Sequence, residues 1–380
     1  MSAMKVKNNK PKILFVCPLP PPIHGSSLVS QNIKDSSLLN EAFEMDFVNL
    51  STSRKLEEVG KHSYWLYAHK AVRFIGTYLK TLWKLTIQRY DLCYLAITCH
   101  GVGFLKDAPF VLLCKFFGRK VVIHQHNKGM NKDVDRPIYR WLLPMVYRNT
   151  KVILLSWRLY PDIEKVVKRE QVMICPNGIP DVNSKKTTDE RNNDVPHILF
   201  LSNLIVSKGV LVLLDALKIL KERGFQFVCD FVGGESKELD CNRFNNEVDI
   251  RNLEGLAIYH GRKYGNDKYG FFKKADIFTQ PTYDDCFPLT ILEAMQHKLP
   301  IVATEVGAIP DEVCDDINGL ISKEKDANDL AEKLAMLICD PLLRQRMGEE
   351  GYKRYKKLFT KQKFEDNMRR ILNDCIECND

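Results

Sequence analysis

The sequence predicts an α/β protein with two parallel sheets, and three observations lead to this prediction. Short apolar segments rich in β-branched residues alternate with longer amphipathic segments, which is typical of parallel strands covered by helices. The alternation stops at a polar segment near the middle of the chain and then starts again. The length of 380 residues exceeds one ordinary core but suits two domains. We therefore expect two Rossmann-like domains joined by a linker.

The first domain is expected to span residues 1–180. Apolar residues occupy both faces of its predicted strands, as in a buried parallel sheet. The strands are predicted at 12–17, 47–50, 92–97, 120–125, 152–156 and 171–175. The helices between them are predicted near 28–39, 67–89, 104–117, 137–147 and 160–167.

The second domain is expected to span residues 197–358, after a linker at 181–196 that is polar throughout (DVNSKKTTDERNNDVP). Its strands are predicted at 197–202, 226–232, 256–260, 277–280 and 301–304. Its helices are predicted at 209–223, 238–246, 268–274 and 288–296. Two further helical patterns cover 328–339 and 341–378.

Charge is unevenly distributed between the two halves. Residues 1–180 contain 27 Lys and Arg against 13 Asp and Glu, whereas residues 181–380 contain 29 against 35. A basic first half indicates an anionic partner: nucleic acid, a phosphate-bearing substrate or an anionic membrane surface. Nucleic acid is disfavoured because the sequence contains no zinc finger or other nucleic-acid-binding motif.

The predicted helix at 67–89 has two interpretations. It combines five Lys and Arg residues with Phe74 and Trp83, a composition that suits contact with an anionic membrane. Alternatively, it packs against the sheet of the first domain. No apolar run is long enough to span a bilayer, and twelve scattered cysteines suit a reducing compartment. We expect a cytoplasmic protein, in peripheral contact with the inner face of the plasma membrane under the first interpretation.

Ligands of such folds bind at the carboxyl ends of the strands, so candidate residues are sought in the loops that follow strands. Gly25 follows the first strand in PLPPPIHGSS and lets backbone N–H groups approach an anion at a helix start. His126 ends the strand in VVIHQHNKG, where an imidazole can form a hydrogen bond with a substrate. Together with His124 it would instead chelate a metal, although no third ligand is near in sequence.

Two loops of the second domain carry further candidates. Lys208, in FLSNLIVSKGV, lies beside a helix start and suits a phosphate, because its charge adds to the helix dipole and the free N–H groups. Gly307, in TEVGAIPD, allows close backbone approach after the next strand.

The segment DDCFPLTILEAM also follows a strand. Pro288 suits the first helical position and leaves Leu289 and Thr290 with unpaired backbone donors. Glu293 lies about one turn further on the same helix face, where it can accept hydrogen bonds from vicinal hydroxyls. Asp285 lies on the preceding loop. The alternative is a capped helix with no ligand.

Together these segments resemble the retaining GT-B glycosyltransferases of family 4, the group 1 glycosyl transferases. The resemblance is strongest over about 195–320, through SNLIVSKGVLVLLDAL, FVGGE, KKADIFTQPTYDDCFPLTILEAM and PIVATEVGAIPDEV, and weaker in PPPIHGSS, VVIHQHN and MICPNGI. It implies the GT-B fold, in which two Rossmann-like domains face each other across a cleft. The first domain would bind the acceptor and the second the donor. A C-terminal helix at 359–380 would return to the first domain.

The resemblance also implies roles for individual residues. Asp285 and Glu293 take the places of the family's Glu-x7-Glu, so Glu293 is expected to bind the nucleotide ribose and Asp285 to lie near the transferred sugar. Asp285 is one methylene shorter than the family's glutamate. Asn203 stands where relatives carry an arginine. His126, Asp285 and Lys208 are the expected catalytic residues. The expected donor-binding residues are Gly25, Asn203, Lys208, Phe287, Pro288, Leu289, Thr290, Glu293 and Gly307.

The expected function is transfer of a sugar, with retention, from a nucleotide-diphosphate sugar to a glycan or lipid-linked acceptor in bacterial-type surface polysaccharide biosynthesis. No metal or other cofactor is expected, because cations and N–H groups can stabilise the leaving group. Asp133-Val134-Asp135 spells the Asp-x-Asp of metal-dependent transferases but does not end a strand. The alternatives are a non-catalytic nucleotide-sugar-binding subunit and a sugar-nucleotide epimerase.

Overall fold

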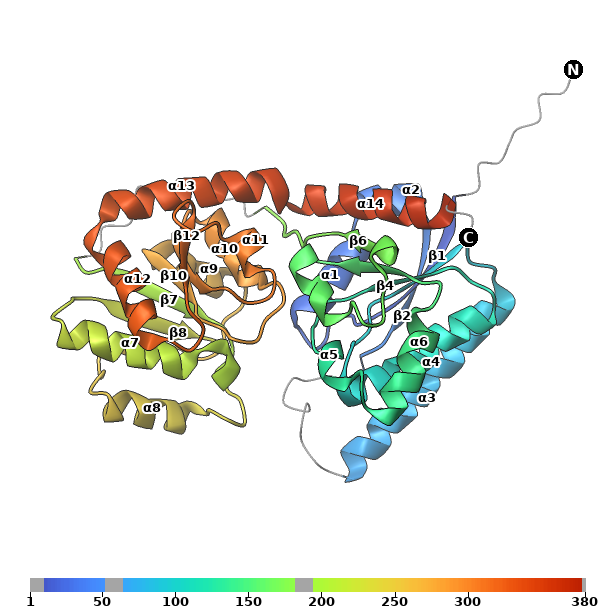
Figure 1. Ribbon diagram of the computed structural model, residues 1–380, viewed down its shortest axis with the longest axis horizontal. Helices are drawn as coiled ribbons and strands as arrows, with labels where there is room; N and C mark the ends of the chain where they lie inside the picture. The colour runs from blue at the N-terminus through green and yellow to red at the C-terminus, as the bar shows by residue number, and fades with distance from the viewer. Residues whose placement is uncertain (1–9, 52–63, 182–193, 378–380) are drawn as a thin grey trace, which may run out of the picture. The chain divides into compact units, whose positions relative to one another are not determined.

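The computed structural model describes residues 10–51, 64–181 and 194–377, which form two compact units (Figure 1). One unit comprises Met1–Asn177 together with Gln362–Asp380, and the other comprises Gly178–Lys361. Within the described residues, each unit contains a six-stranded parallel sheet. The predicted fold class of two Rossmann-like α/β domains is confirmed. Most of the predicted linker, 182–193, lies outside the described residues.

The sheet of the first unit has the strand order β2-β1-β3-β4-β5-β6. The chain moves from β1 outward to β2 and then returns to the other side of β1, so the winding direction reverses between β1 and β3. Ligands bind at such a reversal point in open α/β sheets. The strands are β1 (Lys12–Cys17), β2 (Glu44–Asn49), β3 (Leu92–Leu95), β4 (Val121–His124), β5 (Lys151–Leu154) and β6 (Val172–Ile174).

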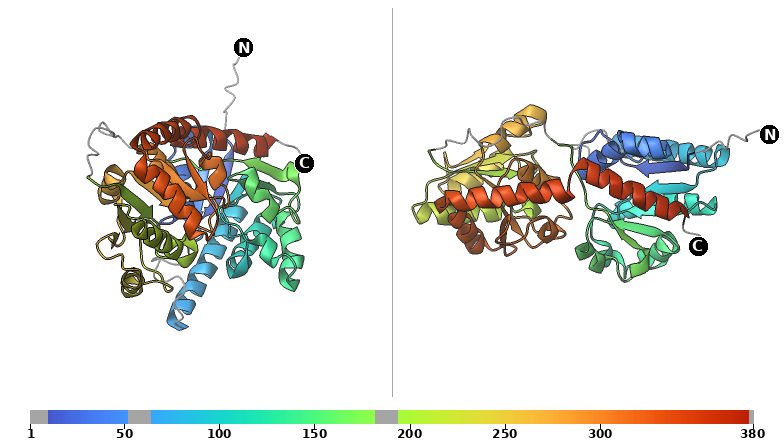
Figure 2. Two further views of the ribbon diagram at one scale, coloured as in Figure 1. Left: turned by 60° about the vertical axis from the view of Figure 1, so that its left-hand side comes forward. Right: turned by 90° about the horizontal axis from the view of Figure 1, so that it is seen from above.

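Helices cover both faces of this sheet, with α3, α4 and α6 together on one side and α14 on the other (Figures 1 and 2). The helices are α1 (Gly25–Lys34), α2 (Ser37–Ala42), α3 (Tyr64–Ile87), α4 (Gly101–Phe116), α5 (Met130–Asp133), α6 (Pro137–Tyr147) and α14 (Lys361–Glu377). Lys120 Nζ donates to the carbonyl oxygen of Ile376 in α14 at 2.6 Å. The predicted return of a C-terminal helix to the first unit is therefore confirmed. Among the described helices, none is both long and apolar enough to cross a bilayer.

The sheet of the second unit has the order β12-β11-β10-β7-β8-β9. Its winding reverses between β7 and β10, which lie side by side at the centre of the sheet and are parallel. The strands are β7 (His197–Leu201), β8 (Val228–Val232), β9 (Ala257–Tyr259), β10 (Ile277–Gln280), β11 (Ile301–Thr304) and β12 (Gly319–Ser322).

Helices also cover both faces of the second sheet. Leu213, Leu217 and Leu220 of α7 pack into a fully buried apolar cluster that includes Phe231 of β8 and Leu334 of α12. In Figure 1, α7, α8 and α12 lie on one side of the sheet, and α9, α10 and α13 lie on the other. The helices are α7 (Val210–Glu222), α8 (Cys241–Ile250), α9 (Gly265–Lys274), α10 (Leu289–Gln296), α11 (Ile309–Glu312), α12 (Ala327–Cys339) and α13 (Pro341–Leu358).

Several predicted elements are wrong in extent. The helix predicted at 28–39 is two helices, because Ser36 caps α2 by accepting a hydrogen bond from Leu39 N. The helix predicted at 160–167 is instead a 3₁₀ helix, Trp157–Asp162, with Pro161 inside it. The pattern over 341–378 is interrupted between α13 and α14. The final strand of the second sheet, β12, was not predicted.

Candidate functional site

Lys208 and Asp285 meet at the reversal point of the second sheet. Lys208 lies on the loop after β7, and Asp285 on the loop after β10. Lys208 Nζ lies 2.7 Å from Asp285 Oδ2 and donates to the carbonyl oxygen of Asp284 at 2.9 Å. Asp285 also accepts a hydrogen bond from Cys286 N at 2.9 Å. Both side chains are partly exposed, so the pair stands where a ligand can reach it.

Glycines allow the surrounding loops to pack this closely. Gly209 has φ +85°, and a Cβ there would lie 1.9 Å from the carbonyl oxygen of Pro281. Gly307 has φ +57°, and a Cβ there would lie 2.5 Å from the carbonyl oxygen of Asp285. Tyr283 N donates to the carbonyl oxygen of Ser207 at 2.9 Å. The loops after β7, β10 and β11 are thereby held together through their backbones.

Helix α10 begins beside this pair, one residue later than the sequence predicts. Pro288 is the N-cap in extended conformation (φ −70°, ψ 112°), and the first helical residue is Leu289. The predicted N1 position of Pro288 is therefore wrong, because its ψ angle is not helical. Among the described residues, no side chain caps this helix start. The first N–H groups of α10, including those of Leu289 and Thr290, are orphan donors of the helix that can satisfy an anion.

Glu293 lies on α10 and pairs with Lys268 of α9 at 2.5 Å. Burial raises the pKa of the Glu293 carboxyl, and the charge and hydrogen bond of Lys268 oppose this rise. Lys268 thereby favours the ionised form of Glu293, which accepts hydrogen bonds only. Pattern reasoning did not identify Lys268, because it lies 25 residues from Glu293 in the sequence.

The remaining predicted residues of the second unit have defined contacts. Asn203 Oδ1 accepts a hydrogen bond from Gly234 N at 2.9 Å. Phe287 is buried and makes an edge contact with Phe359 at 5.9 Å between ring centroids. Thr290 Oγ1 lies 3.5 Å from Gln280 Oε1. Asn203 therefore fixes the loop after β8 and presents no charge of its own.

Arg262, from the loop after β9, was also missed by sequence reasoning. A Cβ built on Gly234 would lie 2.3 Å from Arg262 Nη2, so the guanidinium fills the space beside this glycine. Because the side chain of Asn203 accepts a hydrogen bond from Gly234 N, the guanidinium lies near Asn203, where the family resemblance predicts an arginine. The only signal in the sequence was Gly234 itself, which leaves room for a long side chain.

Glu312 of α11 is the third residue that sequence reasoning missed. Its side chain is fully buried, and neither carboxyl oxygen has a hydrogen-bond partner among the described residues. Burial, followed by the negative charges of Asp285 and Asp311, raises the pKa of Glu312 well above 4.5, while Arg354 opposes the rise. The charge of Asp285 therefore acts on Glu312 as well as on Lys208.

The first unit contains a cavity of about 210 Å³ at the carboxyl ends of its central strands. It is lined by loops that follow β1, β2, β3 and β4, including both sides of the reversal point. Its polar lining consists of His24, Ser26, Ser51, Thr98, Lys106, Asp107, His126 and Asn127. Gly25 is the first residue of α1, and a Cβ there would meet no atom within 4 Å, so the space in front of it is open.

His126 presents a neutral imidazole to this cavity. Burial, followed by the charge of His24, lowers the pKa of His126 to about 3. Its Nε2 atom is buried and has no hydrogen-bond partner among the described residues. The ring lies 4.0 Å from that of His124, whose Nδ1 is bonded to Tyr94 Oη at 2.7 Å. An orphan nitrogen in a cavity suits a hydroxyl group of a ligand.

The Asp-x-Asp segment has a structural role at its first residue. Asp133 is buried, accepts a hydrogen bond from Gly101 N at 2.6 Å and pairs with Arg136 at 2.8 Å. These contacts join the start of α4 to the end of α5. Among the described residues, no group of three or more His, Cys, Asp or Glu side chains is arranged to hold a metal ion.

A family profile matches most of the second unit by sequence. The profile of the family described as Glycosyl transferases group 1 matches residues 182–354. An uncharacterized glycosyltransferase of Methanocaldococcus jannaschii is 29% identical over 224 residues, which make up 59% of each chain. The capsular polysaccharide biosynthesis glycosyltransferase CapM of Staphylococcus aureus is 25% identical over 185 residues, or 49% of this chain and 48% of CapM. The chain thus spans about half the length of these curated relatives.

The fold as a whole resembles that of solved glycosyltransferase structures. HepE of Anabaena in complex with UDP-glucose has a TM-score of 0.74 and 16% sequence identity, and the likeness covers 96% of this chain and 99% of that chain. At this identity the likeness shows the fold alone. It confirms the expected GT-B fold class.

Proposed function

We propose that this chain transfers a sugar from a nucleoside-diphosphate sugar to a glycan or lipid-linked acceptor, because residues 182–354 match the family described as Glycosyl transferases group 1. One observation carries the proposal: the Lys208–Asp285 pair stands at the reversal point of the second sheet, beside the uncapped start of α10. A cation and free N–H groups at this point suit a diphosphate leaving group. Transfer with retention is the family's expectation and is part of the proposal.

The donor would bind along α10. Lys208 and the backbone N–H groups of Leu289 and Thr290 would hold the diphosphate, and Glu293, one turn further, would accept hydrogen bonds from the ribose hydroxyls. Asp285, held by Lys208, would face the transferred sugar. HepE holds UDP-glucose in its solved structure, which supports a nucleotide-sugar donor of this kind.

Arg262 would supply a second cation to the diphosphate. Sequence reasoning finds Asn203 where relatives carry an arginine, but the guanidinium of Arg262 lies beside Gly234, to which Asn203 is bonded. A guanidinium is always charged and can bind two phosphate oxygens at once. The loss of one arginine would therefore be compensated from the loop after β9.

The cavity of the first unit would bind a sugar hydroxyl group and a phosphate of the acceptor. The unpaired Nε2 of His126 would form a hydrogen bond with a sugar hydroxyl as a neutral group, because the pKa of His126 is lowered to about 3. Lys106 lies in the same cavity, with Nζ 3.0 Å from Asp107 Oδ1. A phosphate of a lipid-linked acceptor would find a cation there.

We propose that the reaction needs no metal ion. Lys208, Arg262 and the start of α10 supply positive potential where negative charge develops on the leaving diphosphate. Asp133, the first acid of the Asp-x-Asp segment, is engaged with Gly101 and Arg136. CapM, a relative by sequence, is named for capsular polysaccharide biosynthesis, which supports a role in surface glycan assembly. The proposed place of this role is the inner face of the plasma membrane.

A thermal-shift screen against nucleotide sugars tests the donor proposal, because a ligand that binds only the folded state raises the melting temperature. The cognate donor should stabilise the wild type. Glu293→Ala should weaken donor binding by about tenfold or more, since hydrogen bonds to charged groups contribute about 1.5–3 kcal/mol. Glu254→Ala, which removes an exposed glutamate, is the matched control. Unchanged donor affinity in Glu293→Ala would refute the ribose assignment.

Turnover separates the proposed transferase from the two alternatives. Release of nucleoside diphosphate that depends on an acceptor supports transfer. Conversion of the sugar nucleotide without an acceptor would identify an epimerase. Donor binding with no turnover for any donor and acceptor would identify a non-catalytic subunit.

A further inference from the structure

One face of α3 is apolar and exposed over most of the length of the helix. Val72, Ile75, Leu79, Trp83 and Ile87 are all exposed, from 55% for Ile75 to 69% for Val72. At about 100° per residue, these five side chains fall within an arc of about 120° and extend about 22 Å along the helix. Isolated exposed apolar residues are common on soluble proteins, but a continuous stripe of this length marks a contact surface.

The opposite face of the same helix already packs against the first unit. The rings of Phe74 and Tyr78 make edge contacts with Phe110 of α4, at 5.5 and 5.6 Å between centroids. Thr81 and Leu85 are buried beneath the helix. Packing against the unit therefore uses a different set of residues and does not account for the exposed stripe.

The charges of α3 have one sign and lie beside the stripe. The helix contains Lys70, Arg73, Lys80 and Lys84 and no acidic residue. At about 100° per residue, all four lie on one flank of the apolar arc. Lys80 is exposed, and Lys84 pairs with Asp46 of β2 at 2.7 Å. An apolar face with a cationic flank is the pattern of a helix that lies in a membrane interface.

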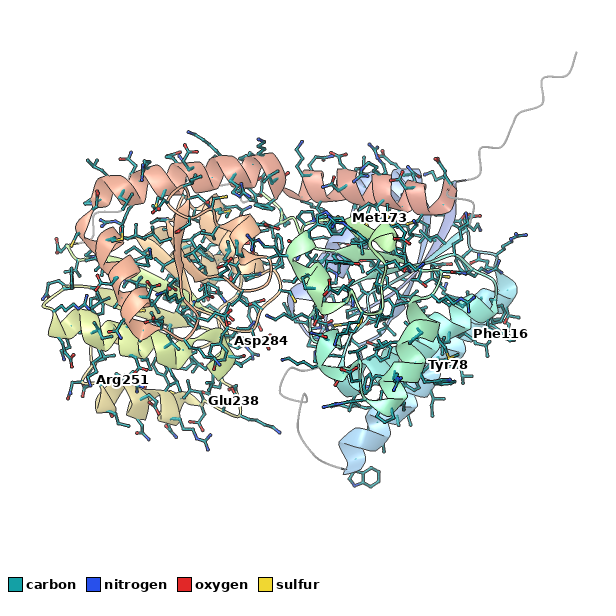
Figure 3. The ribbon with its side chains drawn as sticks, in the orientation of Figure 1. Tyr78, Phe116, Met173, Glu238, Arg251 and Asp284 are labelled. Atoms are coloured by element: carbon teal, nitrogen blue, oxygen red, sulfur yellow. The ribbon has the colours of Figure 1, made fainter. Side chains whose placement is uncertain are left out.

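Two other helices in the layer that contains α3 expose similar residues (Figure 1). Ile138, Trp141 and Met145 recur every three to four positions on the outer side of α6, whose sequence also lacks acids. Phe116 is 85% exposed at the end of α4. Figure 3 labels Phe116 and Tyr78 in this layer of helices. Tryptophan is favoured at the boundary between lipid chains and headgroups, so Trp83 and Trp141 suit the same partner.

We propose that the outer face of α3, extended by that of α6, lies on an anionic lipid bilayer, with Val72, Ile75, Leu79, Trp83 and Ile87 entering the boundary of the acyl chains. The cationic flank would contact the lipid headgroups. A second copy of this chain is the weaker occupant, because α3 and α6 contain basic residues and no acidic residue, so two such faces would bring like charges together. The inference deepens the proposed function, since it names the surface that a lipid-linked acceptor would share.

Vesicle co-sedimentation tests this proposal with the full chain. The wild type should bind vesicles of phosphatidylglycerol and phosphatidylcholine more tightly than vesicles of phosphatidylcholine alone, and added salt should weaken the binding. Leu79→Asp should weaken binding by about tenfold or more, because it places a charge where an exposed leucine would enter the membrane interface. Ile250→Asp on α8, at a site that is 71% exposed in the second unit, is the matched control and should bind as the wild type does.

Three outcomes would overturn the proposal. They are no vesicle binding by the wild type, an equal loss of vesicle affinity in Leu79→Asp and Ile250→Asp, and vesicle binding that does not depend on the anionic lipid. Light scattering that shows a wild-type dimer and a Leu79→Asp monomer would assign the face to a second copy. Quenching of Trp83 fluorescence by brominated acyl chains, with the other tryptophans replaced by phenylalanine, checks insertion directly. The donor-induced thermal shift is measured on the same variants. If no variant shows this shift, the donor proposal is refuted, whereas the proposal of membrane binding is judged separately by the vesicle experiment.

Discussion

Replacing Glu312 by glutamine should make the second unit more stable, and the gain should grow with pH. Glu312→Gln removes the ionisable group and keeps the shape of the side chain. The glutamate is fully buried, and its carboxyl oxygens have no hydrogen-bond partner among the described residues. Nε and Nη2 of Arg354 donate to the backbone carbonyl oxygens of Glu312 and Asp311. Ionised Glu312 would therefore be a buried charge without a bonded counter-ion.

The sign of the effect follows from proton linkage. The folded-state pKa of Glu312 is raised well above 4.5 by burial and by the charges of Asp285 and Asp311. The folded state therefore retains a proton that the unfolded chain releases above its own pKa. The stability that this proton contributes is fully present below the unfolded pKa and is lost as pH rises toward the folded pKa. One proton of difference corresponds to about 1.4 kcal/mol per pH unit.

The assay is urea unfolding of wild type and Glu312→Gln at several pH values and constant ionic strength, followed by far-UV circular dichroism. The difference in unfolding free energy should increase by about 1.4 kcal/mol per pH unit until the folded pKa is reached. For a domain of this size, each kcal/mol corresponds to about 2–4 °C in melting temperature. Glu254→Gln is the control for the loss of one exposed carboxyl group. A difference that does not change with pH would refute the assignment of Glu312 as a buried acid with a raised pKa.

Two further changes test the donor site and the packing of its loops. Arg262→Ala should weaken binding of a nucleoside diphosphate by about tenfold, the equivalent of one charge-assisted hydrogen bond, and should weaken binding of the nucleoside much less. Calorimetry measures both affinities, with Arg243→Ala on α8 as the control. Equal losses of affinity for the two ligands would instead indicate that Arg262 recognises the base. Gly209→Ala should destabilise the second unit by about 3 kcal/mol or more, because the new methyl group would lie 1.9 Å from the carbonyl oxygen of Pro281. Gly224→Ala has a similar positive φ but open space around it, so it should cost only about 1 kcal/mol; equal unfolding free energies for the two variants would show that backbone strain alone sets the cost.

Most strands and the donor-site segment were predictable because their signals are local. β1, β10 and β11 have the predicted bounds, since short apolar β-branched runs specify buried parallel strands. The meeting of the loops that hold Lys208 and Asp285 was also predictable, because the carboxyl ends of parallel strands share one edge of a sheet. Pro288 was placed one residue wrongly, as helix ends depend on backbone angles that a pattern does not specify.

The sequence by itself determined the type of most elements, the order of the motifs and the identity of the residues at the strand ends. Only the tertiary structure decided which distant side chains meet: Lys268 with Glu293, and Arg262 beside Gly234. It also decided which apolar face of α3 is buried. The helix carries one apolar face with Phe74 and Leu85 and another with Leu79, and the pattern alone does not distinguish them. Burial is set by contacts between segments far apart in the chain, which periodicity along one helix does not contain.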